Sequence, residues 1–385
     1  MKTNWQTKKL GDILKLEYGK PLPDLKRKVN GKYPVFGANG EKDRSDDFYF
    51  DKPSIIVGRK GSAGELTLVQ EKFWPLDVTY FATFDDKKYD LKFLYNLLET
   101  LELPKLAKGV KPGINRNDIY SIEVNIPPLP EQKRIVKILD EVFEKIEKAK
   151  ENAEKNLKNS KEIFESYLHN IFAPPSLRLW TGKESLGKDW GEKKLKEIGK
   201  TQTGLTPKTS NKKYYGNFVP FITPADIDIL GDGSIRYDSK GLSEEGLEVG
   251  RKIEKNSVLM VCIGATIGKV GFATQMVSCN QQINTLTPES KYEAKLFYYI
   301  LSTKSFFNKV IKSSSQATLP IINKGKWENL IISFPKSISE QQAIVKKLDA
   351  LSEQTKKLEG VYAQKLADLE ELKKSILNKA FSGEL

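Results

Sequence analysis

The chain has 385 residues, with 63 Lys or Arg against 50 Asp or Glu, so its net charge at pH 7 is +13. That length leaves room for two or three domains, and 39% hydrophobic residues are enough to build buried cores. No run approaches the roughly 18 apolar residues of a membrane-spanning helix, and no apolar segment of a signal peptide follows the first lysines. These features predict a cytoplasmic protein without membrane contact.

The cysteines and the single histidine exclude most thiol and imidazole chemistry. Cys262 and Cys279 are too few for a disulfide framework, and their apolar or small neighbours predict reduced, buried thiols. His169 lies late in a helical pattern, where we expect a solvated or interface position. Histidine-rich metal sites and histidine-dependent nucleophiles are therefore not expected, and we predict no metal and no catalytic residue.

The first region, residues 1–128, has the pattern of mixed strand, turn and short helix. Strands are predicted at 54–58 and 79–83, where Val, Ile, Tyr and Phe are bounded by Gly, Pro or Asn, and a helix at 91–101.

A long helix is predicted next, within residues 129–172. Apolar residues recur there with alternating spacings of three and four, which is typical of the seam between two coiled-coil helices. About 42 helical residues at 1.5 Å each form a rod of roughly 60 Å. The predicted seam positions are Ile135, Leu139, Val142, Ile146, Leu157, Phe164 and Leu168.

The same order of elements then returns. Residues 173–337 are predicted to hold strands at 218–222 and 257–263 and a short helix at 294–303, and residues 338–385 to form a second long helix. The seam positions predicted for the second helix are Ile344, Leu348, Leu351, Leu358, Tyr362, Leu369, Leu372 and Ile376.

An internal repeat explains this return. The twelve residues from Leu129 to Asp140 align with those from Ile338 to Asp349 at an offset of 209, and seven of the twelve are identical. The repeat predicts an α+β fold of two mixed domains joined by two long antiparallel coiled-coil helices, with pseudo-twofold symmetry. Ordinary surface helices on separate cores are the alternative.

The positive charge is concentrated in the globular regions. Residues 1–128 hold 22 basic and 18 acidic residues and 173–337 hold 24 and 15, whereas each long helix is neutral. Basic domains on neutral spacers favour binding to nucleic acid phosphates, although net charge can also serve solubility alone.

Within both regions the basic residues gather in loops that contain Gly, Pro or Asn. Lys and Arg in such loops can hold phosphates, and Arg, Asn, Gln or Thr can contact base edges, although any single loop can also be a solvated turn. The candidate DNA-binding residues are Lys20, Arg27, Arg59, Lys60, Lys111, Arg116, Lys208, Lys212, Lys213, Thr266, Lys269, Gln281, Gln282, Lys324 and Lys326.

Motifs for cofactors and catalysis are incomplete. The segment from Gly264 to Lys269 resembles a phosphate-binding loop, but Val270 stands where Ser or Thr is required. The tripeptide beginning at Glu192 matches a short nuclease pattern that a highly charged chain contains by accident.

The organisation resembles that of specificity subunits of type I restriction-modification systems. The resemblance covers nearly the whole chain and rests on two variable regions, each followed by a helix that begins with Glu-Gln, at Glu131 and Glu340. The segments 203–207, 219–224, 264–269 and 280–282 are similar to recurrent motifs of target-recognition domains. In the first half, residues 61–64 stand where the second half has 264–268.

The resemblance implies a non-enzymatic DNA-reading subunit. Each domain would read one half of a bipartite asymmetric target in double-stranded DNA, and the helices would set the distance between the halves. Two methyltransferase (modification) subunits would be recruited directly and restriction subunits through them. No cofactor is expected, because the methyl donor binds the modification subunit.

Two other classes of protein stay open at this point. A self-contained DNA-modifying enzyme would need a catalytic motif that the chain lacks. A non-enzymatic coiled-coil scaffold, whose basic domains bind acidic partners, would show no preference for base sequence.

Overall fold

The structure is a computed structural model, and it describes residues 4–172, 189–228, 233–315 and 319–385. The first part of the second region, residues 173–188, lies outside the described residues.

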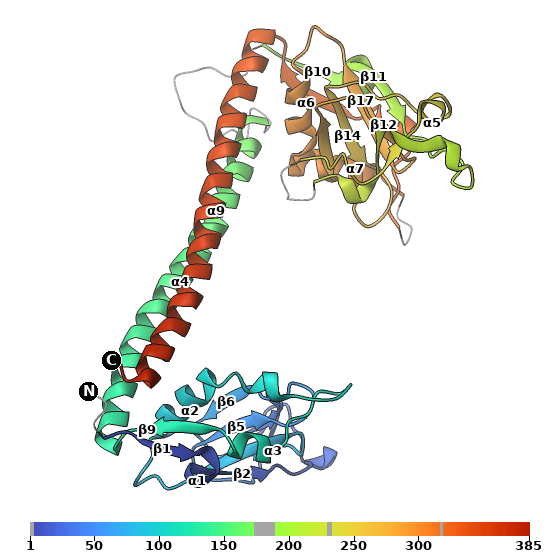
Figure 1. Cartoon of the computed structure of the whole chain (residues 1–385). Helices are drawn as coiled ribbons and strands as arrows, with labels where there is room; N and C mark the ends of the chain where they lie inside the picture. The colour runs from blue at the N-terminus through green and yellow to red at the C-terminus, as the bar shows by residue number, and fades with distance from the viewer. Residues whose placement is uncertain (1–3, 173–188, 229–232, 316–318) are drawn as a thin grey trace. The chain divides into compact units, whose positions relative to one another are not determined.

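The elements follow the order expected from the repeat (Figure 1). The helices are α1 (Leu10–Ile13), α2 (Leu91–Thr100), α3 (Arg116–Tyr120), α4 (Leu129–Phe172), α5 (Glu244–Val249), α6 (Ala294–Leu301), α7 (Lys304–Ser313), α8 (Lys324–Trp327) and α9 (Ile338–Ser382). The strands are β1 (Gln6–Lys9), β2 (Leu14–Tyr18), β3 (Tyr33–Gly37), β4 (Gly40–Ser45), β5 (Ser54–Gly58), β6 (Leu66–Val69), β7 (Trp74–Pro75), β8 (Thr79–Phe84), β9 (Glu123–Ile126), β10 (Trp190–Lys194), β11 (Gly199–Thr203), β12 (Tyr215–Ile222), β13 (Gly241–Leu242), β14 (Ser257–Val261), β15 (Val270–Ala273), β16 (Ser278–Cys279), β17 (Ile283–Pro288) and β18 (Ile331–Pro335).

The chain divides into two compact units, and both long helices contribute to each unit. Unit 1 comprises residues 1–155 and 362–385, and unit 2 comprises residues 156–361. Each unit therefore contains one globular domain, part of α4 and part of α9. The four-segment division drawn from the sequence stays a prediction about function.

Three small sheets build the domain of unit 1. A four-stranded sheet has the order β2-β8-β5-β6, a three-stranded sheet the order β4-β3-β7, and β1 pairs with β9. Leu16, Ile55 and Val57 of the four-stranded sheet are at most 1% exposed, and α2 adds Phe93 and Leu94 to the same core. The predicted strands 54–58 and 79–83 correspond to β5 and β8.

Unit 2 repeats this topology. Its four-stranded sheet has the order β11-β17-β14-β15, its three-stranded sheet the order β13-β12-β16, and β10 pairs with β18. The middle strand of each three-stranded sheet, β3 or β12, pairs antiparallel with one neighbour and parallel with the other. The internal repeat thus extends to the pairing of every sheet.

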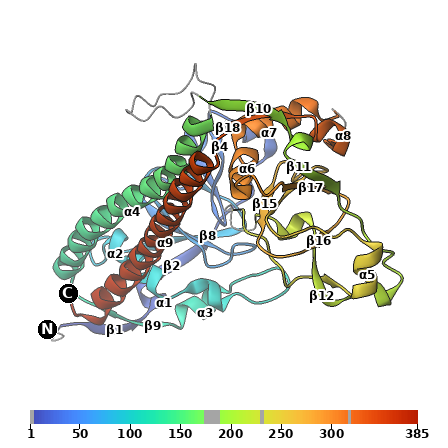
Figure 2. The ribbon, with the colours of Figure 1, turned by 90° about the horizontal axis from the view of Figure 1, so that it is seen from above.

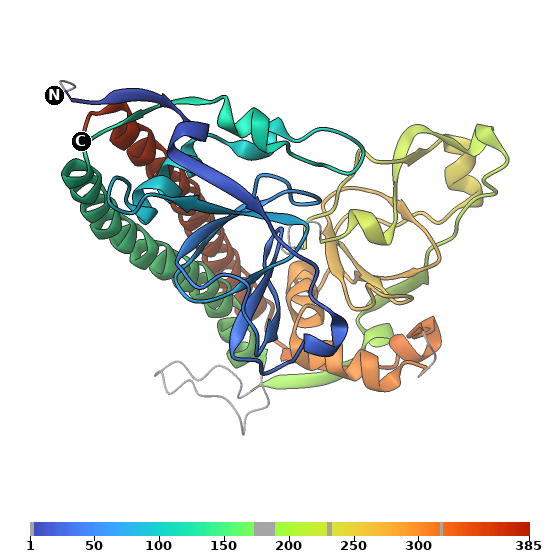
Figure 3. The ribbon, with the colours of Figure 1, turned by 90° about the horizontal axis from the view of Figure 1, so that it is seen from below.

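In unit 1 the start of α4 packs against the end of α9, so the two helices are antiparallel there (Figures 2 and 3). Ile135 and Leu139 share a core cluster with Leu377 and Ala380, and an ion pair of 2.7 Å joins Lys150 Nζ to Glu370 Oε1. An apolar stripe on a helix of this length needs such a partner, because the stripe would otherwise face water.

In unit 2 the end of α4 packs against the start of α9. Leu168 and Ile171 share a cluster with Ile344, Val345 and Leu348, again in antiparallel order. The long helices predicted within 129–172 and 338–385 are therefore confirmed as α4 and α9.

A buried glutamine fixes each long helix to its own domain. The Gln132 side chain accepts from the Asp90 N–H (2.8 Å) and donates to the carbonyl oxygens of Lys88 (3.1 Å) and Pro127 (2.9 Å). Gln341, 209 positions later, is 0% exposed and makes two such bonds. The Glu-Gln pair that marks the repeat thus has a structural cause, since a buried amide requires hydrogen-bond partners.

Most predicted seam residues are buried or half-buried, but two are exposed. Leu358 is 40% exposed and Leu372 46% exposed, so both lie outside the packed stripe. Ser160 and Thr355 in unit 2 and Leu377 and Ala380 in unit 1 are buried on the helices instead. A straight α-helix drifts against a strict seven-residue pattern, which moves some apolar positions out of the contact.

Both cysteines are free and buried, and burial raises the pKa of each thiol to about 12. His169 is exposed near the end of α4. Among the described residues, no helix is long and apolar enough to cross a membrane.

Candidate nucleic-acid interface

A pair of loops at one end of each four-stranded sheet, together with the short helix that follows the second loop, carries eight of the fifteen predicted residues. In unit 1 the loop after β5 meets the loop before α3, where the Gly61 N–H donates to the Pro112 carbonyl oxygen at 2.9 Å. In unit 2 the loop after β14 meets the loop before α8 in the same way, from Gly264 to Pro320 at 3.1 Å. The two units thus share the same arrangement of two loops joined by backbone hydrogen bonds, which we call the loop frame.

The strand registers and these backbone hydrogen bonds define which residues are equivalent. Tyr18 corresponds to Thr203, Arg59 to Cys262, Tyr80 to Asn284, and Arg116 to Lys324. Gly61 and Gly64 correspond to Gly264 and Gly268, and all four have positive φ angles between 82° and 97°. The loop of unit 2 is one residue longer between its two glycines.

In unit 1 this frame assembles two arginines around an aromatic pair. The guanidinium carbons of Arg59 and Arg116 lie 5.2 and 4.8 Å from the centre of the Tyr18 ring. The Tyr80 ring centre lies 5.2 Å from that of Tyr18, and burial together with the neighbouring Tyr18 raises the pKa of Tyr80. We call these four residues the Tyr18 cluster.

Sheet register explains why these residues meet. Tyr18 pairs with Tyr80 across β2 and β8, and Tyr80 pairs with Val57 across β8 and β5. Directly opposite residues share a face, and Arg59 follows Val57 by two positions, so its side chain points to that face as well. Arg116 enters from the first residue of α3, whose N-cap is Asn115.

The other predicted residues of unit 1 have different environments. Lys20 lies with its Nζ 5.0 Å from the centre of the Tyr49 ring, and Lys60 and Lys111 are exposed on the two loops. Arg27 is paired with Asp43 at 2.5 Å and with Asp24 at 3.2 Å, so its charge is largely neutralised.

In unit 2 the equivalent place is polar and carries amides. The Thr203 hydroxyl donates to Asn284 Oδ1 at 2.8 Å, and Asn284 is 2% exposed. Asn280 Nδ2 donates to Gln282 Oε1 at 2.9 Å, and Thr206 donates to Gln281 Oε1 at 2.6 Å. Gln281 is exposed and Gln282 half-buried, so both remain near solvent.

The predicted DNA-binding lysines of unit 2 differ in their exposure and in their partners. Lys208, Lys212, Lys213 and Lys326 are exposed, as is Thr266. By contrast, Lys269 is half-buried and donates to the Ile227 carbonyl oxygen at 3.4 Å, and Lys324 pairs with Glu328 at 2.6 Å. Lys324 therefore offers less charge to a ligand than the sequence alone suggests, and Lys269 is less accessible than the exposed lysines.

Sequence reasoning selected both arginines of the Tyr18 cluster but not its tyrosines. An exposed tyrosine at the end of a short strand gives no signal in sequence, because only the pairing of β2 with β8 brings it to the arginines.

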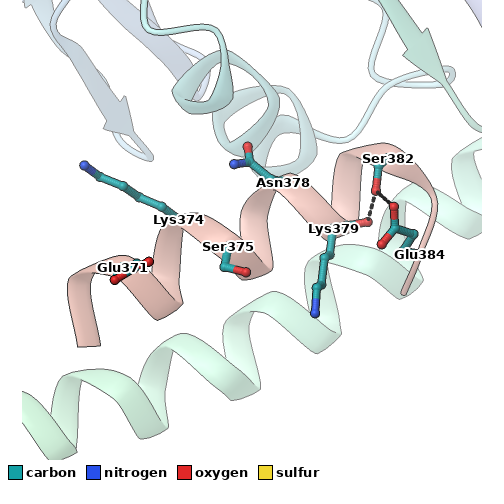
Figure 4. A pocket seen from close by; sticks show the side chains of 7 residues that line it. All are labelled: Glu371, Lys374, Ser375, Asn378, Lys379, Ser382 and Glu384. Carbon is teal, nitrogen blue, oxygen red and sulfur yellow. Dashed lines mark hydrogen bonds between the residues drawn. The ribbon is translucent and has the colours of Figure 1, made fainter. Parts of the chain in front are cut away.

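A shallow depression lies on the last turns of α9 in unit 1, with its lining side chains on successive turns (Figure 4). It is lined by Glu371, Lys374, Ser375, Asn378, Lys379, Ser382 and Glu384. Its cations and anions balance, so this surface suits a polar protein contact better than phosphates. Among the described residues, no group of three or more His, Cys, Asp or Glu side chains could hold a metal ion.

Comparison with known proteins gives a family. Residues 2–156 and 187–368 match the type I restriction modification DNA specificity domain. The chain is 25% identical to the EcoBI specificity subunit of Escherichia coli, over 86% of this chain and 73% of that protein. It is 28% identical to the MjaIX specificity subunit of Methanocaldococcus jannaschii, over 47% of this chain and 42% of that relative's length.

A solved structure shares the fold. The chain aligns with one from a study of complex assembly and conformational transition of the type I R-M system, with a TM-score of 0.77 and 20% identity. The alignment covers 100% of this chain and 99% of the other.

Proposed function

Because the chain belongs to the type I restriction-modification DNA specificity family, we propose that its two units each read one half of a bipartite, asymmetric target in double-stranded DNA. The chain is a specificity subunit and thus a non-catalytic component of its system. One observation carries the proposal: a single loop frame occurs twice, with an arginine-tyrosine cluster in unit 1 and an amide-rich surface in unit 2.

This asymmetry supports two different half-sites. Side chains read bases, whereas the backbone frame only positions them, so one fold with two side-chain sets selects two sequences. The net charge of +13 supplies the phosphate attraction that any DNA reader needs.

The long helices would set the distance between the half-sites. Each has at least 44 residues, which corresponds to about 65 Å at 1.5 Å per residue. Apart from the apolar contacts between α4 and α9, both helices carry balanced charges and have no excess of lysine for DNA.

The experiment that tests this function is a methylation-sensitive long-read map of host DNA with and without the gene. We expect loss of N6-methyladenine at one bipartite motif. One heptad inserted into both helices should change only the length of the unread spacer. An unchanged methylome beside a functional methyltransferase would overturn the proposal and favour the scaffold alternative.

The exposed faces of the helices would recruit two methyltransferase subunits, and through them restriction subunits. In unit 1 the depression on α9 has balanced charges (Figure 4). The exposed Leu372 follows Glu371 of its lining in the same helix, so α9 offers both polar and apolar groups, as protein interfaces do.

Charge reversal on that face tests the recruitment. The double variant Glu371→Lys with Lys374→Glu should lower co-purification of the methyltransferase at least tenfold, because both charges would then meet like charges on the partner. Reversal of exposed Asp86 and Lys87, in the loop before α2, is the control and should leave assembly intact. Normal assembly of the α9 variant would contradict recruitment through this face.

A further inference from the structure

The two arginines of the Tyr18 cluster are not neutralised. Neither Arg59 nor Arg116 has an ion pair with any acidic residue in the described ranges. Both guanidinium groups lie against one tyrosine ring, which is 45% exposed. A positive charge held at the surface without a carboxylate is available to an anionic or electron-rich ligand.

The two arginines are held differently. Arg116 Nη1 donates to the Leu16 carbonyl oxygen at 3.0 Å, so part of its hydrogen-bonding capacity serves the protein. The Arg59 side chain donates to no acceptor among the described residues, and its Nε atom is buried without a partner. The buried Nε atom is an exception to the rule that buried donors are satisfied, and no ligand can reach it. The two Nη groups of Arg59 are not among the buried atoms and also donate to no acceptor in the described residues, so they are the donors that a ligand can accept from.

The chemistry of guanine fits those donors. In the major groove guanine presents O6 and N7, two neighbouring acceptors that a planar guanidinium binds with two parallel hydrogen bonds. Contact with the Tyr18 ring restricts the guanidinium plane, so less conformational entropy is lost on binding. The exposed Lys60 and Lys111 on the adjoining loops are suited to phosphates, which leaves the ordered arginine for a base.

We propose that Arg59 recognises a guanine in the half-site of unit 1, with Tyr18 and Arg116 as positioning residues. This inference rests on the proposed function, since it presumes that unit 1 reads DNA. The contact belongs to unit 1 alone, because Cys262 and Lys324 stand at the equivalent positions in unit 2.

The test begins with the full-length chain and a randomised duplex library selected at moderate salt. A chimaera with residues 1–128 taken from a relative identifies which selected half-site belongs to unit 1, because only that half-site should change. We expect the half-site of unit 1 to contain at least one invariant guanine.

The decisive measurement replaces that guanine by 7-deazaguanine, which lacks the N7 acceptor. Binding of the unaltered chain should weaken about tenfold, whereas Arg59→Ala should bind both duplexes equally. Arg59→Lys should keep the salt dependence of binding and lose most of the preference for guanine. If the unaltered chain did not respond to the modified base, the inference would be overturned whether or not any variant folds.

A matched control separates base contacts from phosphate contacts. Lys60→Ala, in the neighbouring position, should weaken binding to all sequences equally and lower the slope of log K against log salt by about one. If Arg59→Ala behaved in that way and still preferred guanine, Arg59 would be a phosphate ligand and the inference would be wrong.

The outcomes also separate the two proposals. A bipartite target without guanine in the half-site of unit 1 would overturn only the assignment of Arg59. Selection of no sequence at all by the unaltered chain would overturn the proposed function as well.

Discussion

The two units build the same loop frame with different side chains, and the difference lies where a ligand can reach. The frame is held by backbone hydrogen bonds, such as those from Gly61 to Pro112 and from Gly264 to Pro320. Backbone bonds do not depend on the identity of neighbouring side chains, so Tyr18 can replace Thr203 and Arg59 can replace Cys262 without loss of the frame. A fold of this kind can change what it reads without a change in its architecture.

The units also differ in how their polar groups are satisfied. In unit 2, Asn280 and Gln282 bond to each other and Thr206 bonds to Gln281, so part of the amide capacity is used within the protein. In unit 1, Arg59 has no internal acceptor among the described residues. We therefore expect single substitutions at the reading surface to change specificity more in unit 1 than in unit 2.

The largest expected effect comes from exchange of a whole domain. Replacement of residues 1–128 by the corresponding region of a relative should replace one half-site completely and leave the other half-site and the spacer unchanged. The same methylation map measures all three. A change in both half-sites would refute independent reading by the two units.

The buried glutamines allow a comparison of stability. Gln132→Ala removes three hydrogen bonds and Gln341→Ala removes two, and each leaves buried or partly buried backbone groups without partners. We expect the free energy of unfolding to fall by about 3 kcal/mol in the first variant and about 2 kcal/mol in the second. These values are at the lower end of the roughly 1 to 3 kcal/mol expected for each unsatisfied group.

Hydrogen exchange resolved by peptide can assign each loss to its own unit. Substitution of exposed Gln364 by Ala is the control and should change exchange in neither unit. If one variant lowered the protection from exchange equally in both units, or only in the other unit, the two glutamines would not anchor the helices independently.

The loop glycines should respond unequally to a methyl group. A Cβ atom at Gly64 would lie 2.4 Å from the backbone nitrogen of Pro104, whereas one at Gly268 would meet the ring of Phe307 at 2.3 Å. The backbone at Pro104 cannot move aside as the ring of Phe307 can. We therefore expect Gly64→Ala to lower the free energy of unfolding by about 3 kcal/mol and Gly268→Ala to lower it by about 2 kcal/mol.

Thermal unfolding of the two loop variants measures this difference. Gly61→Ala is the control, because its Cβ would meet nothing within 4 Å and only its φ of 82° opposes the change, at about 1 kcal/mol. A control that destabilised the chain as much as Gly64→Ala would contradict the steric explanation.

The smallest effect is expected at Arg27. Joint replacement of Arg27 and Asp43 by Ala removes an exposed ion pair without a change in net charge. DNA affinity should change less than about twofold, because such pairs contribute roughly 0 to 1 kcal/mol and a paired arginine has little charge to offer. Lys111→Ala should instead lower the salt slope by about one. A tenfold loss on removal of the pair would place Arg27 at the DNA.

Much of the fold could be predicted from the sequence, because the signals were local. The apolar spacing predicted α4 and α9, and strands 54–58 and 257–263 correspond to β5 and β14, the second ending two residues earlier than predicted. Leu358 and Leu372 escaped this reasoning, since helical periodicity gives a face but not the extent of contact with a partner. Likewise the hydrogen bonds of Gln132 could not be predicted, because only the fold brings Lys88 and Asp90 to its side chain.

For the candidate site, composition and loop position selected Arg59 and Arg116, since basic residues beside glycines stand out in any sequence. They did not select Tyr18, and they gave Arg27 and Lys324 the same weight as residues that carry no ion pair. The partner of Arg27, Asp43, lies on β4, and no local pattern shows that pairing. Lys324 and Glu328 have the four-residue spacing of a helical ion pair, so that pair could have been recognised in the sequence.

The sequence by itself determined the duplicated organisation, the two long helices and the excess of positive charge in the globular regions, because periodicity, repetition and composition are properties of the linear chain. Only the tertiary structure decided which arginines share a tyrosine and which threonines bond to which amides. Those relations arise from sheet register and loop packing, which bring together residues that are about 40 to 100 positions apart. A shift of one residue in register would turn the side chains of a strand to the opposite face of the sheet.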